Sequence, residues 1–239
     1  MALTVSSVSR VLISKVYFES MISPGSPVIY GAFQTNVDLQ SGSPVFGSPE
    51  SQLALFASAQ LARMHNLPFR SGGMFASSKI ADAQAAYESI QVMLPSILGR
   101  VNFVLHAAGW LEGGLTTGYE KFVLDCELLG MYHKLMAGMD LSDEALALDS
   151  IRSVPPGGHH LGTEYTLRNF RTAFHRADLF DYNSAEQWLE EGAQDAETRA
   201  HAKYKQLLES YQGPELDPDI DAALLDYMTR RKSEIKPEY

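Results

Sequence analysis

Short strand-like runs alternate with longer amphipathic segments over the first 140 residues of the chain. The runs are brief and rich in strand-forming side chains, and they lie at residues 28–33, 67–70 and 101–106. The longer segments repeat apolar side chains at nearly helical spacing, which predicts helices over residues 49–66, 81–98 and 119–137. Strand–loop–helix units in series predict a parallel sheet with right-handed crossovers.

Local signals support the predicted helices and indicate their buried sides. Ser48, Pro49 and Glu50 fit the N-cap and the first two positions of a helix, because serine caps a free N–H and proline lacks one. The predicted buried stripes are Leu53, Phe56, Ala57, Leu61 and Met64 in one helix, and Phe122, Cys126, Leu129 and His133 in another. Cys126 is therefore expected to be a small buried hydrophobic residue.

From Ser142 onward the pattern is helical only. Helix starts are predicted at Ser142, at Ser184 with Gln187 as a capping box, and at Asp217-Pro218. The first of these helices is expected to end near residue 153, because two prolines and two glycines follow. We therefore expect two parts, with βα units over residues 1–140 and a helical region that packs on them over residues 141–239.

The predicted strands are few for a barrel. A complete (β/α)₈ barrel takes about 250 residues, whereas this chain of 239 residues shows three clear units. Three parallel strands leave sheet edges unpaired, and such edges normally need cover. Either further strands are hidden in the helical half, or the chain is part of something larger.

Composition narrows the class of protein. Apolar residues make up 45% and charged residues 20%, as in soluble globular proteins. The net charge of −10 repels phosphate backbones, so we expect no nucleic-acid partner. Neither a long apolar stretch nor a basic, apolar leader is evident, so we expect no membrane partner and a cytoplasmic location. A single cysteine excludes an internal disulfide and a zinc site built mainly of thiolates.

Candidate functional residues lie where the predicted strands end, since βα folds carry their sites on the loops that follow strands. They are Tyr30 in the first strand, Lys79 after the second, and His106, Trp110, Glu112, Tyr119 and Glu120 at and after the end of the third. His159, in a glycine-rich loop, could lean over the same rim. This set describes an aromatic and acidic pocket, which suits a small organic cation.

Each candidate also has an ordinary structural interpretation. His106 ends an apolar run and fits a satisfied core histidine equally well. Glu120 lies in a first helical turn, where acids are favoured in any case. Lys79 fits a surface pair with Asp82 or a position near a helix start, and the three aromatic candidates fit core positions. Chemistry is therefore not determined by these features alone.

Common catalytic and metal-binding motifs are missing from the sequence. A metal site built from His106, Glu112 and His159 is conceivable, but no ligand spacing supports it, so we expect no metal site. The chain has no Walker loop, no dinucleotide glycine fingerprint and no G-x-S-x-G elbow.

Several ordered segments carry a resemblance to a known family. They are FGSPE at 46–50, GGMFASSK at 72–79, DAQAAYE at 82–88, LHAAGWLE at 105–112, YEKF at 119–122, PGGHHL at 156–161, and the tail near Trp188 and Arg199. Over residues 24 to 235 the chain resembles the trimethylamine methyltransferase family. The resemblance is specific because the motifs are several and occur in order.

The resemblance implies a fold, a reaction and partners. It implies an α/β protein, the C-terminal part of a (β/α)₈ TIM barrel with a helical C-terminal extension, because family members are longer than this chain. It also implies a methyltransferase that moves a methyl group from a tertiary or quaternary amine to Co(I) of a corrinoid protein. The corrinoid (cobalamin) would be carried by that partner and not bound directly. We also expect a homo-oligomer.

The resemblance further implies roles for individual residues. Trimethylamine enzymes carry pyrrolysine near the position of the loop 72–79, and none is present here, so the chain resembles the branch that uses quaternary amines such as glycine betaine. The expected catalytic residues are Glu120 and His106. The expected substrate-binding residues are Tyr30, Lys79, Trp110, Glu112, Tyr119 and His159. The rings and His106 would form the pocket wall, the glutamates would balance charge, and Lys79 or His159 would hold a substrate carboxylate.

Two other classes of function remain open at this point. The chain could be an inactive remnant that serves as an interaction or self-associating module, because half a barrel exposes apolar strand surface. It could also be an unrelated α/β lyase or hydrolase, although the nucleophile or metal site of such an enzyme is not evident.

Overall fold

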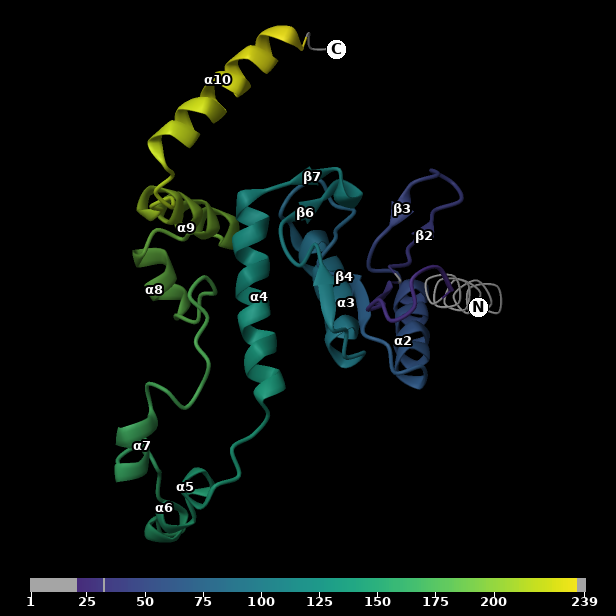
Figure 1. The fold of residues 1–239 in the computed structure, drawn as a ribbon. Coiled ribbons are helices and arrows are strands. Elements are labelled where there is room, and N and C mark those ends of the chain that lie inside the picture. Colours follow the sequence, from purple (N-terminus) through teal and green to yellow (C-terminus); the bar gives the residue numbers. More distant parts are fainter. Residues whose placement is uncertain (1–20, 32, 236–239) are drawn as a thin grey trace. The chain divides into compact units, whose positions relative to one another are not determined.

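The computed structural model describes residues 21–31 and 33–235 of the 239-residue chain (Figure 1). The chain divides into two compact units, residues 1–204 and residues 205–239. All described strands belong to the first unit.

Three short parallel strands form the main sheet. They are β1 (Tyr30–Gly31), β4 (Phe69–Gly72) and β5 (Phe103–Leu105), in that order across the sheet. Helix α2 (Pro49–Met64) lies in the connection from β1 to β4, and α3 (Ala83–Leu98) lies in the connection from β4 to β5. Strands that follow one another along the chain are thus parallel neighbours, which confirms the predicted βα units.

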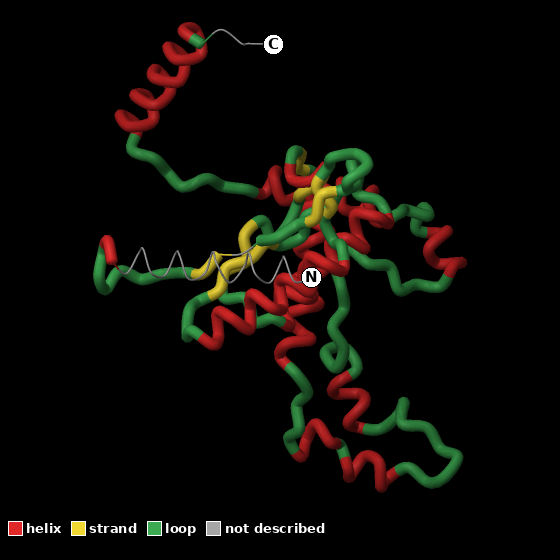
Figure 2. Tube along the Cα trace, turned by 90° about the vertical axis from the view of Figure 1, so that its right-hand side faces the viewer, coloured by secondary structure: helices red, strands yellow, loops and turns green. Residues whose placement is uncertain are grey.

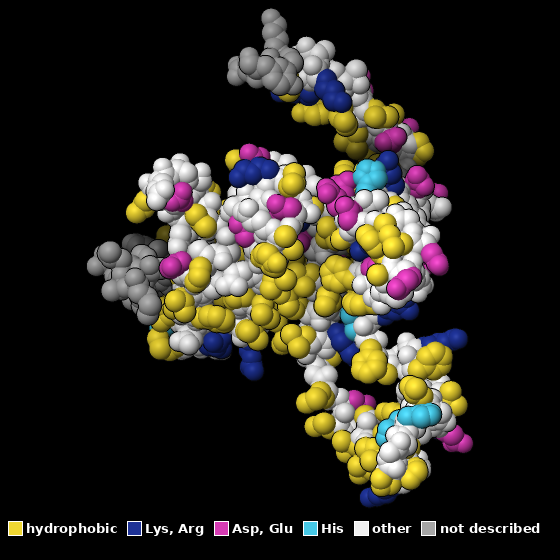
Figure 3. Space-filling model, turned by 180° about the vertical axis from the view of Figure 1, so that it is seen from behind, with side chains coloured by type: hydrophobic (Ala, Val, Ile, Leu, Met, Phe, Trp, Pro, Cys, Tyr) yellow, Lys and Arg dark blue, Asp and Glu magenta, His cyan; other side chains and the backbone are white. Residues whose placement is uncertain are grey.

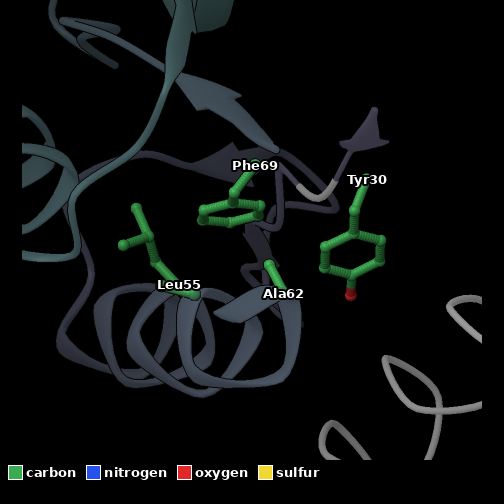
Figure 4. Packing of buried hydrophobic residues seen from close by; sticks show 5 residues of the cluster. Tyr30, Leu55, Ala62 and Phe69 are labelled. Atoms are coloured by element: carbon green, nitrogen blue, oxygen red, sulfur yellow. The ribbon is translucent and has the colours of Figure 1, made fainter. Parts of the chain in front are cut away.

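One face of this sheet packs against helices. Tyr30 and Phe69 point toward α2 and lie on Leu55 and Ala62, and the two rings stack with centroids 5.6 Å apart (Figure 4). Val104 of β5 packs against a second cluster that includes buried residues of α3 and of α4 (Tyr119–Ala137). The helices therefore cover the face that holds Tyr30 and Phe69.

The buried side of α2 differs from the predicted stripe. Its buried side chains are mostly small: Ser51, Gln52, Ala54, Leu55, Ser58, Ala59 and Ala62. Leu53 and Met64, which were members of the predicted stripe, are exposed. Small side chains let a helix backbone approach the sheet closely and fill the space at native density. The predicted stripe was therefore right for Phe56 and Leu61, which are partly buried and pack against the cluster of Tyr30 and Phe69, and wrong for Leu53 and Met64.

Helix α4 has the predicted bounds but a different buried side. Its buried side chains are Lys121, Val123, Asp125 and Tyr132. Of the predicted stripe, Leu129 is partly buried and packs against the cluster of Met74, Met93 and Tyr132, whereas Phe122, Cys126 and His133 are exposed. The prediction failed for these three residues because this helix buries a lysine and an aspartate that hydrogen-bond each other, and charged residues are buried only when they are paired in this way.

The predicted helix caps are confirmed. The Ser48 side chain accepts a hydrogen bond from the N–H of Ser51 at 3.3 Å, with Pro49 in the first turn. The Ser184 side chain accepts from the N–H of Gln187 at 3.3 Å. The Gln187 side chain donates forward to the Glu191 carboxylate at 2.9 Å, which is not the bond back to the Ser184 N–H that a capping box forms.

Two small antiparallel hairpins lie in segments that the sequence indicated as loops. They pair β2 (Asn36–Val37) with β3 (Pro44–Val45), and β6 (Trp110–Leu111) with β7 (Thr116–Thr117) (Figure 2). The 3₁₀ turn η1 (Glu112–Gly114) joins the second pair. Strands of two residues are too short to show the alternation that identifies a strand in a sequence.

The second half of the described chain is helical, as predicted. Its helices are α5 (Asp143–Leu146), α6 (Leu148–Ser153), α7 (Glu164–Asn169), α8 (Ala185–Glu190), α9 (Ala196–Ser210) and α10 (Pro218–Glu234). The single helix predicted over 142–153 is divided, because Ala147 has a φ of +50° and interrupts the helical path. Asp217 caps α10 as predicted, with its carboxylate 2.9 Å from the N–H of Asp219.

Much apolar surface remains exposed (Figure 3). In the second unit, four apolar side chains of α10 are each about half exposed: Ile220, Leu224, Tyr227 and Met228. In the first unit, Phe103 of β5 is 52% exposed on the sheet face opposite the helices.

Within residues 21–31 and 33–235 the strands form an open sheet and not a closed barrel. The observed class is mixed α/β. Over the same ranges, every helix is too short or too polar to be a candidate for crossing a membrane.

Candidate functional site

Five ring side chains gather beyond the carboxyl ends of the parallel strands. The members of this strand-end cluster are Phe33, Phe46, Phe75, His106 and Trp110. Phe33 follows β1, Phe75 follows β4, and His106 and Trp110 follow β5. Because parallel strands end at the same edge of a sheet, rings that are distant in the sequence meet there.

Phe75 lies at the centre of the strand-end cluster. Its ring centroid is 4.9 Å from that of Phe46, 5.0 Å from Phe33, 4.9 Å from His106 and 5.8 Å from Trp110. His106 and Trp110 meet edge to face at 5.1 Å. Phe75 is buried, whereas Trp110 is half-buried and His106 is exposed. The cluster therefore presents π surface at the protein exterior, and such a surface attracts organic cations.

Two glycines make room for these rings. A Cβ atom on Gly72, the last residue of β4, would overlap the ring of Phe33. Gly114 has a φ of +90°, and a Cβ there would lie 2.6 Å from the ring of Phe75. A larger residue at either position would displace a ring of the cluster.

Backbone hydrogen bonds join the loop after β4 to the loop after β5. The N–H of Ala76 donates to the carbonyl of Trp110 at 3.3 Å, and the N–H of Gly113 donates back to Ala76 at 2.8 Å. The N–H of Glu112 donates to the carbonyl of Ser78 at 2.8 Å. The two loops therefore hold Phe75 and Trp110 as one unit.

Helix α3 anchors the loop after β4. The Glu88 carboxylate accepts hydrogen bonds from the N–H groups of Ser77 and Ser78 at 2.6 and 3.2 Å. Asp82 caps the helix by accepting from the N–H of Ala85 and also accepts from the Ser78 hydroxyl, each at 2.9 Å. These bonds, the one from Ala85 first, lower the pKa of Asp82.

A buried ion pair lies behind the two loops. Lys121 and Asp125 are one turn apart on α4, and their side chains are 3% and 5% exposed. The Lys121 ammonium also donates to the Ser89 hydroxyl at 2.8 Å and to the Met74 carbonyl at 3.4 Å. The Asp125 carboxylate accepts from the N–H of Gly109 at 2.8 Å.

The ion pair is costly to bury and is compensated locally. Burial lowers the pKa of Lys121 and raises the pKa of Asp125, because a low dielectric disfavours both charges. The attraction between the two groups and the Gly109 N–H favour the charged forms. Each charge is therefore the main compensation for the other.

Arg70 lies on the sheet face opposite the helices. Arg70 and Gly72 are two residues apart in β4 and so face the same side of the sheet. The register partners of Arg70 are Gly31 and Phe103. Its side chain packs over Gly31, where a Cβ would lie 3.6 Å from its Cδ. The ring of Phe33 covers Gly72 on the same face. A half-buried cation thus lies next to the strand-end cluster.

Two of the eight predicted site residues, His106 and Trp110, lie in the strand-end cluster. Tyr30 lies elsewhere: it is 2% exposed and belongs to the core between the sheet and α2. Burial raises the pKa of the Tyr30 hydroxyl. The structure therefore places Tyr30 on the other face of the sheet from Phe33.

Lys79 and Glu112 lie on the two loops that carry Phe75 and Trp110. Both are exposed. The Lys79 ammonium donates to the carbonyl of Ser77 at 2.9 Å. The Glu112 carboxylate accepts from a threonine hydroxyl at 2.7 Å within the β6–β7 hairpin.

Tyr119 and Glu120 belong to a second group, which we name the helix-end cluster. It joins the start of α4 to α9 through His201 and Tyr204. A carboxylate oxygen of Glu120 lies 2.7 Å from Nδ1 of His201, and the rings of Tyr119 and Tyr204 stack at 5.1 Å. Tyr119 is 62% exposed.

His159 lines an open hollow that is built from residues 143–168 only. Glu164, Tyr165 and Arg168 of α7 line the same hollow. Its lining includes no member of the strand-end cluster, so the structure does not bring His159 to the other candidates.

Sequence reasoning missed the residues that complete the site. Phe33, Phe46, Phe75 and Arg70 were not candidates, and neither was the ion pair. Phe46 and Phe75 lie inside the segments FGSPE and GGMFASSK that carried the resemblance. The available signal was thus their place in those segments, since an isolated phenylalanine reads as a core residue. Among the described residues, no group of three or more His, Cys, Asp or Glu side chains could hold a metal ion.

The fold and the site together define a class of protein. It is an α/β protein of consecutive parallel βα units, with aromatic side chains collected on the loops after the strands. The sequence model of the trimethylamine methyltransferase (MTTB) family matches residues 2–236. The chain belongs to this family.

Individual relatives sharpen the comparison. The chain is 40% identical over 235 residues to a glycine betaine methyltransferase of Desulfitobacterium hafniense, covering 98% of this chain and 49% of the relative. It is 33% identical over 210 residues to trimethylamine methyltransferase MttB of Methanosarcina thermophila, covering 87% and 43%. A proline betaine:corrinoid methyltransferase of Eubacterium limosum is 32% identical over 208 residues, covering 86% and 43%. The chain thus spans about half the length of these relatives.

Proposed function

We propose that the chain functions in methyl transfer from a quaternary or tertiary methylated amine, of the glycine betaine or trimethylamine type, to the Co(I) corrinoid of a separate protein. Membership of the family and the names of the relatives support this reaction class. The observation that carries the proposal is the strand-end cluster, because its chemistry fits the substrate class.

A quaternary ammonium group presents a recognition problem that aromatic rings solve. It carries a full positive charge but has no N–H to donate. Ring faces attract such a cation, and the attraction rises to about 2 kcal/mol when water is excluded. Trp110 and His106 lie at the accessible side of the strand-end cluster and would contact the ammonium methyl groups, while Phe75 supports both rings.

The reaction requires little acid–base chemistry from the chain. As the methyl carbon bonds to the corrinoid acceptor, the C–N bond breaks and its electron pair stays on nitrogen. A quaternary ammonium leaves as a neutral tertiary amine, and a protonated tertiary amine leaves as a neutral secondary amine. The residues of the chain therefore have to remove water from the cation and orient one methyl group.

Arg70 is the residue that we propose for binding the carboxylate of a betaine. Its guanidinium suits a carboxylate, because it offers paired donors in a fixed plane. It lies two residues before Gly72 in β4, on the same face of the sheet, and the ring of Phe33 packs over Gly72. Lys79 and His159 were expected in this role from the sequence. We favour Arg70 because Lys79 is exposed and His159 lines a separate hollow.

The acidic candidates keep a supporting role in the proposal. Glu112 and Glu120 would add negative potential around a bound cation. Each already has a hydrogen-bond partner, Thr116 and His201 respectively. Glu120 acts at the start of α4, beside Tyr119, so its effect on the cation is expected to be smaller than that of Trp110.

The wider architecture is also a proposal. We propose that the βα units of residues 1–140 are the C-terminal part of a (β/α)₈ barrel, with the Arg70 face of the sheet toward the barrel interior and residues 141–239 as a helical C-terminal extension. That the relatives are about twice as long supports this arrangement. The proposed partner is a corrinoid protein, and the proposed location is the cytoplasm. We also propose that the chain forms a homo-oligomer.

A second candidate function is an interaction module without catalysis. The half-exposed Phe103 and the unpaired outer sides of β1 and β5 among the described residues favour it. Such a surface would bind another copy or a second chain. Light scattering coupled to gel filtration separates a monomer from a self-associated form, and a change of mass across the concentration series supports this candidate.

Ligand binding tests the first candidate directly. The full chain carrying Trp188→Phe reports Trp110 fluorescence alone, because the sequence has two tryptophans. We expect saturable quenching by glycine betaine, and about tenfold weaker binding of 3,3-dimethylbutyrate, the isostere in which an uncharged tert-butyl group replaces the trimethylammonium group. Methyl transfer is then followed by the absorption change of free Co(I) cobalamin. Equal binding of the two ligands, or no binding, contradicts the proposal.

A further inference from the structure

The proposed function depends on where Trp110 and Phe75 are held relative to each other. The two residues lie on different loops, whose backbones meet at a parallel bridge between Phe75 and Trp110. Short loops of this kind shift easily unless their backbones are anchored to rigid elements.

The buried ion pair contacts both loops at the residues just before these rings. Lys121 donates to the carbonyl of Met74, which precedes Phe75. Asp125 accepts from the N–H of Gly109, which precedes Trp110. One ion pair on one helix therefore holds one backbone atom of each loop.

The pair is itself held rigidly. Its two residues are one turn apart on the 19-residue helix α4, and Ser89 of α3 supplies a third contact to the ammonium group. Gly109 is buried and has a φ of +88°, so its N–H can meet Asp125 while its chain turns toward Trp110. A Cβ on Gly109 would lie 3.1 Å from Phe122.

We propose that Lys121 and Asp125 are positioning residues that set the separation and angle of Phe75 and Trp110 for a methylated ammonium ligand. The ion pair acts through the loop backbones and does not touch the ligand. This inference rests on the proposed function for the identity of the ligand, but its structural part concerns the two loops alone.

A stabilising role and a positioning role predict different results for one double variant. Replacing a buried ion pair by apolar residues of similar volume is often neutral or stabilising, whereas removal of one partner leaves an uncompensated charge. Lys121→Met with Asp125→Leu therefore yields a folded chain without the two anchors. Lys121→Met with Asp125→Asn is the matched variant, because an asparagine oxygen can still accept from Gly109.

The experiment uses the full chain in the Trp188→Phe background and measures three quantities. They are the melting temperature, the acrylamide quenching of Trp110 without ligand, and the dissociation constant of glycine betaine. Leu179→Ala is the control for stability alone, because Leu179 is buried with Val123 and Ala200 in a different cluster. We expect this control to lower the melting temperature and to leave Trp110 quenching unchanged.

For the double variant Lys121→Met, Asp125→Leu (the Met/Leu variant) we expect about twofold greater quenching of Trp110 and about tenfold weaker binding of glycine betaine. Both are measured at temperatures where the chain is fully folded. In the double variant Lys121→Met, Asp125→Asn (the Met/Asn variant), acrylamide should quench Trp110 nearly as weakly as in the parent chain. Unchanged quenching and unchanged affinity in the folded Met/Leu variant overturn the proposal, as does a changed quenching with unchanged affinity. If the parent chain does not bind glycine betaine, the proposed function fails, while the quenching result still decides whether the pair positions the loops.

Discussion

The strand-end cluster and the helix-end cluster are built from similar residues but are held in different ways. Each combines aromatic rings with one histidine. The strand-end cluster is anchored through the backbone of two loops, by ladder-like bonds and by a buried ion pair. The helix-end cluster joins two helices through partly exposed side chains, with the polar contact of Glu120 and His201 between side chains that are 27% and 47% exposed.

The two clusters differ in whether water can take the place of a lost polar partner. An exposed ion pair exchanges its partner for water at little cost, whereas a buried pair has no such substitute. The strand-end cluster should therefore keep a fixed geometry, as a binding site requires. The helix-end cluster should tolerate substitution, which is why we place the substrate at the former.

The largest effect should come from removal of one buried charge. Asp125→Ala leaves Lys121 unpaired and should lower the free energy of unfolding by about 3–5 kcal/mol. The matched change in the other cluster, Glu120→Ala, should cost less than about 1 kcal/mol. Urea denaturation of both variants measures the two values, and similar losses would remove the distinction between the clusters.

The next effect concerns ligand affinity. Trp110→Ala should weaken binding of tetramethylammonium by about tenfold, because the cation loses the indole ring, which is the strongest cation–π partner among the aromatic side chains. Tyr204→Ala, in the helix-end cluster, should change it less than about twofold. Isothermal calorimetry gives both dissociation constants. A stronger effect at Tyr204 would place the cation at the helix-end cluster.

A third prediction concerns Arg70, which we propose binds the carboxylate of a betaine beside the strand-end cluster. Arg70→Gln should weaken binding of glycine betaine about tenfold and leave tetramethylammonium within about twofold, because only the former has a carboxylate. The same calorimetric titrations apply. Equal loss for both ligands would mean that Arg70 acts on the fold and not on the carboxylate.

A smaller effect is expected from Glu120→Gln. The carboxylate is partly exposed and paired with His201, so its loss should weaken binding of both cations by only about two- to threefold. The effect should disappear at 1 M salt, where a screened long-range charge contributes little. A salt-independent loss of tenfold or more would instead show direct contact with the substrate.

The smallest effect is a pH dependence at the loop after β4. The pKa of Asp82 is lowered in the folded chain, so the unfolded chain binds the proton more tightly. The stabilisation by Asp82 is therefore present above its unfolded pKa and is lost as the pH falls through its folded pKa. Asp82→Asn keeps the cap and should melt with a shallower dependence between about pH 5 and pH 3. Parallel curves for the two proteins would exclude this role.

Local sequence was enough to predict much of the fold. The helix starts at Ser48, Ser184 and Asp217 follow from capping chemistry within three residues of the cap. Helix α4 has its predicted bounds, and the parallel order of β1, β4 and β5 follows from the alternation of strands and helices.

The buried sides of the helices could not be predicted in the same way. In α2 the position of Ala59 is buried and that of Leu53 is exposed, because closeness to the sheet selects small residues. In α4 the sequence distance between Lys121 and Asp125 shows that they can pair, but not that both are buried. Burial depends on the loops that lie over them.

By itself, the sequence of this protein determined its α/β class, its helix starts, its acidic charge and its family, since each is encoded in neighbouring residues or ordered motifs. The tertiary structure decided which side chains meet at the candidate site. It joined Phe33, Phe75 and Trp110, separated His159 from them, and placed Tyr30 in the core. The physical reason is that parallel strands bring loops together at one sheet edge, and which side chains meet there depends on strand order and register.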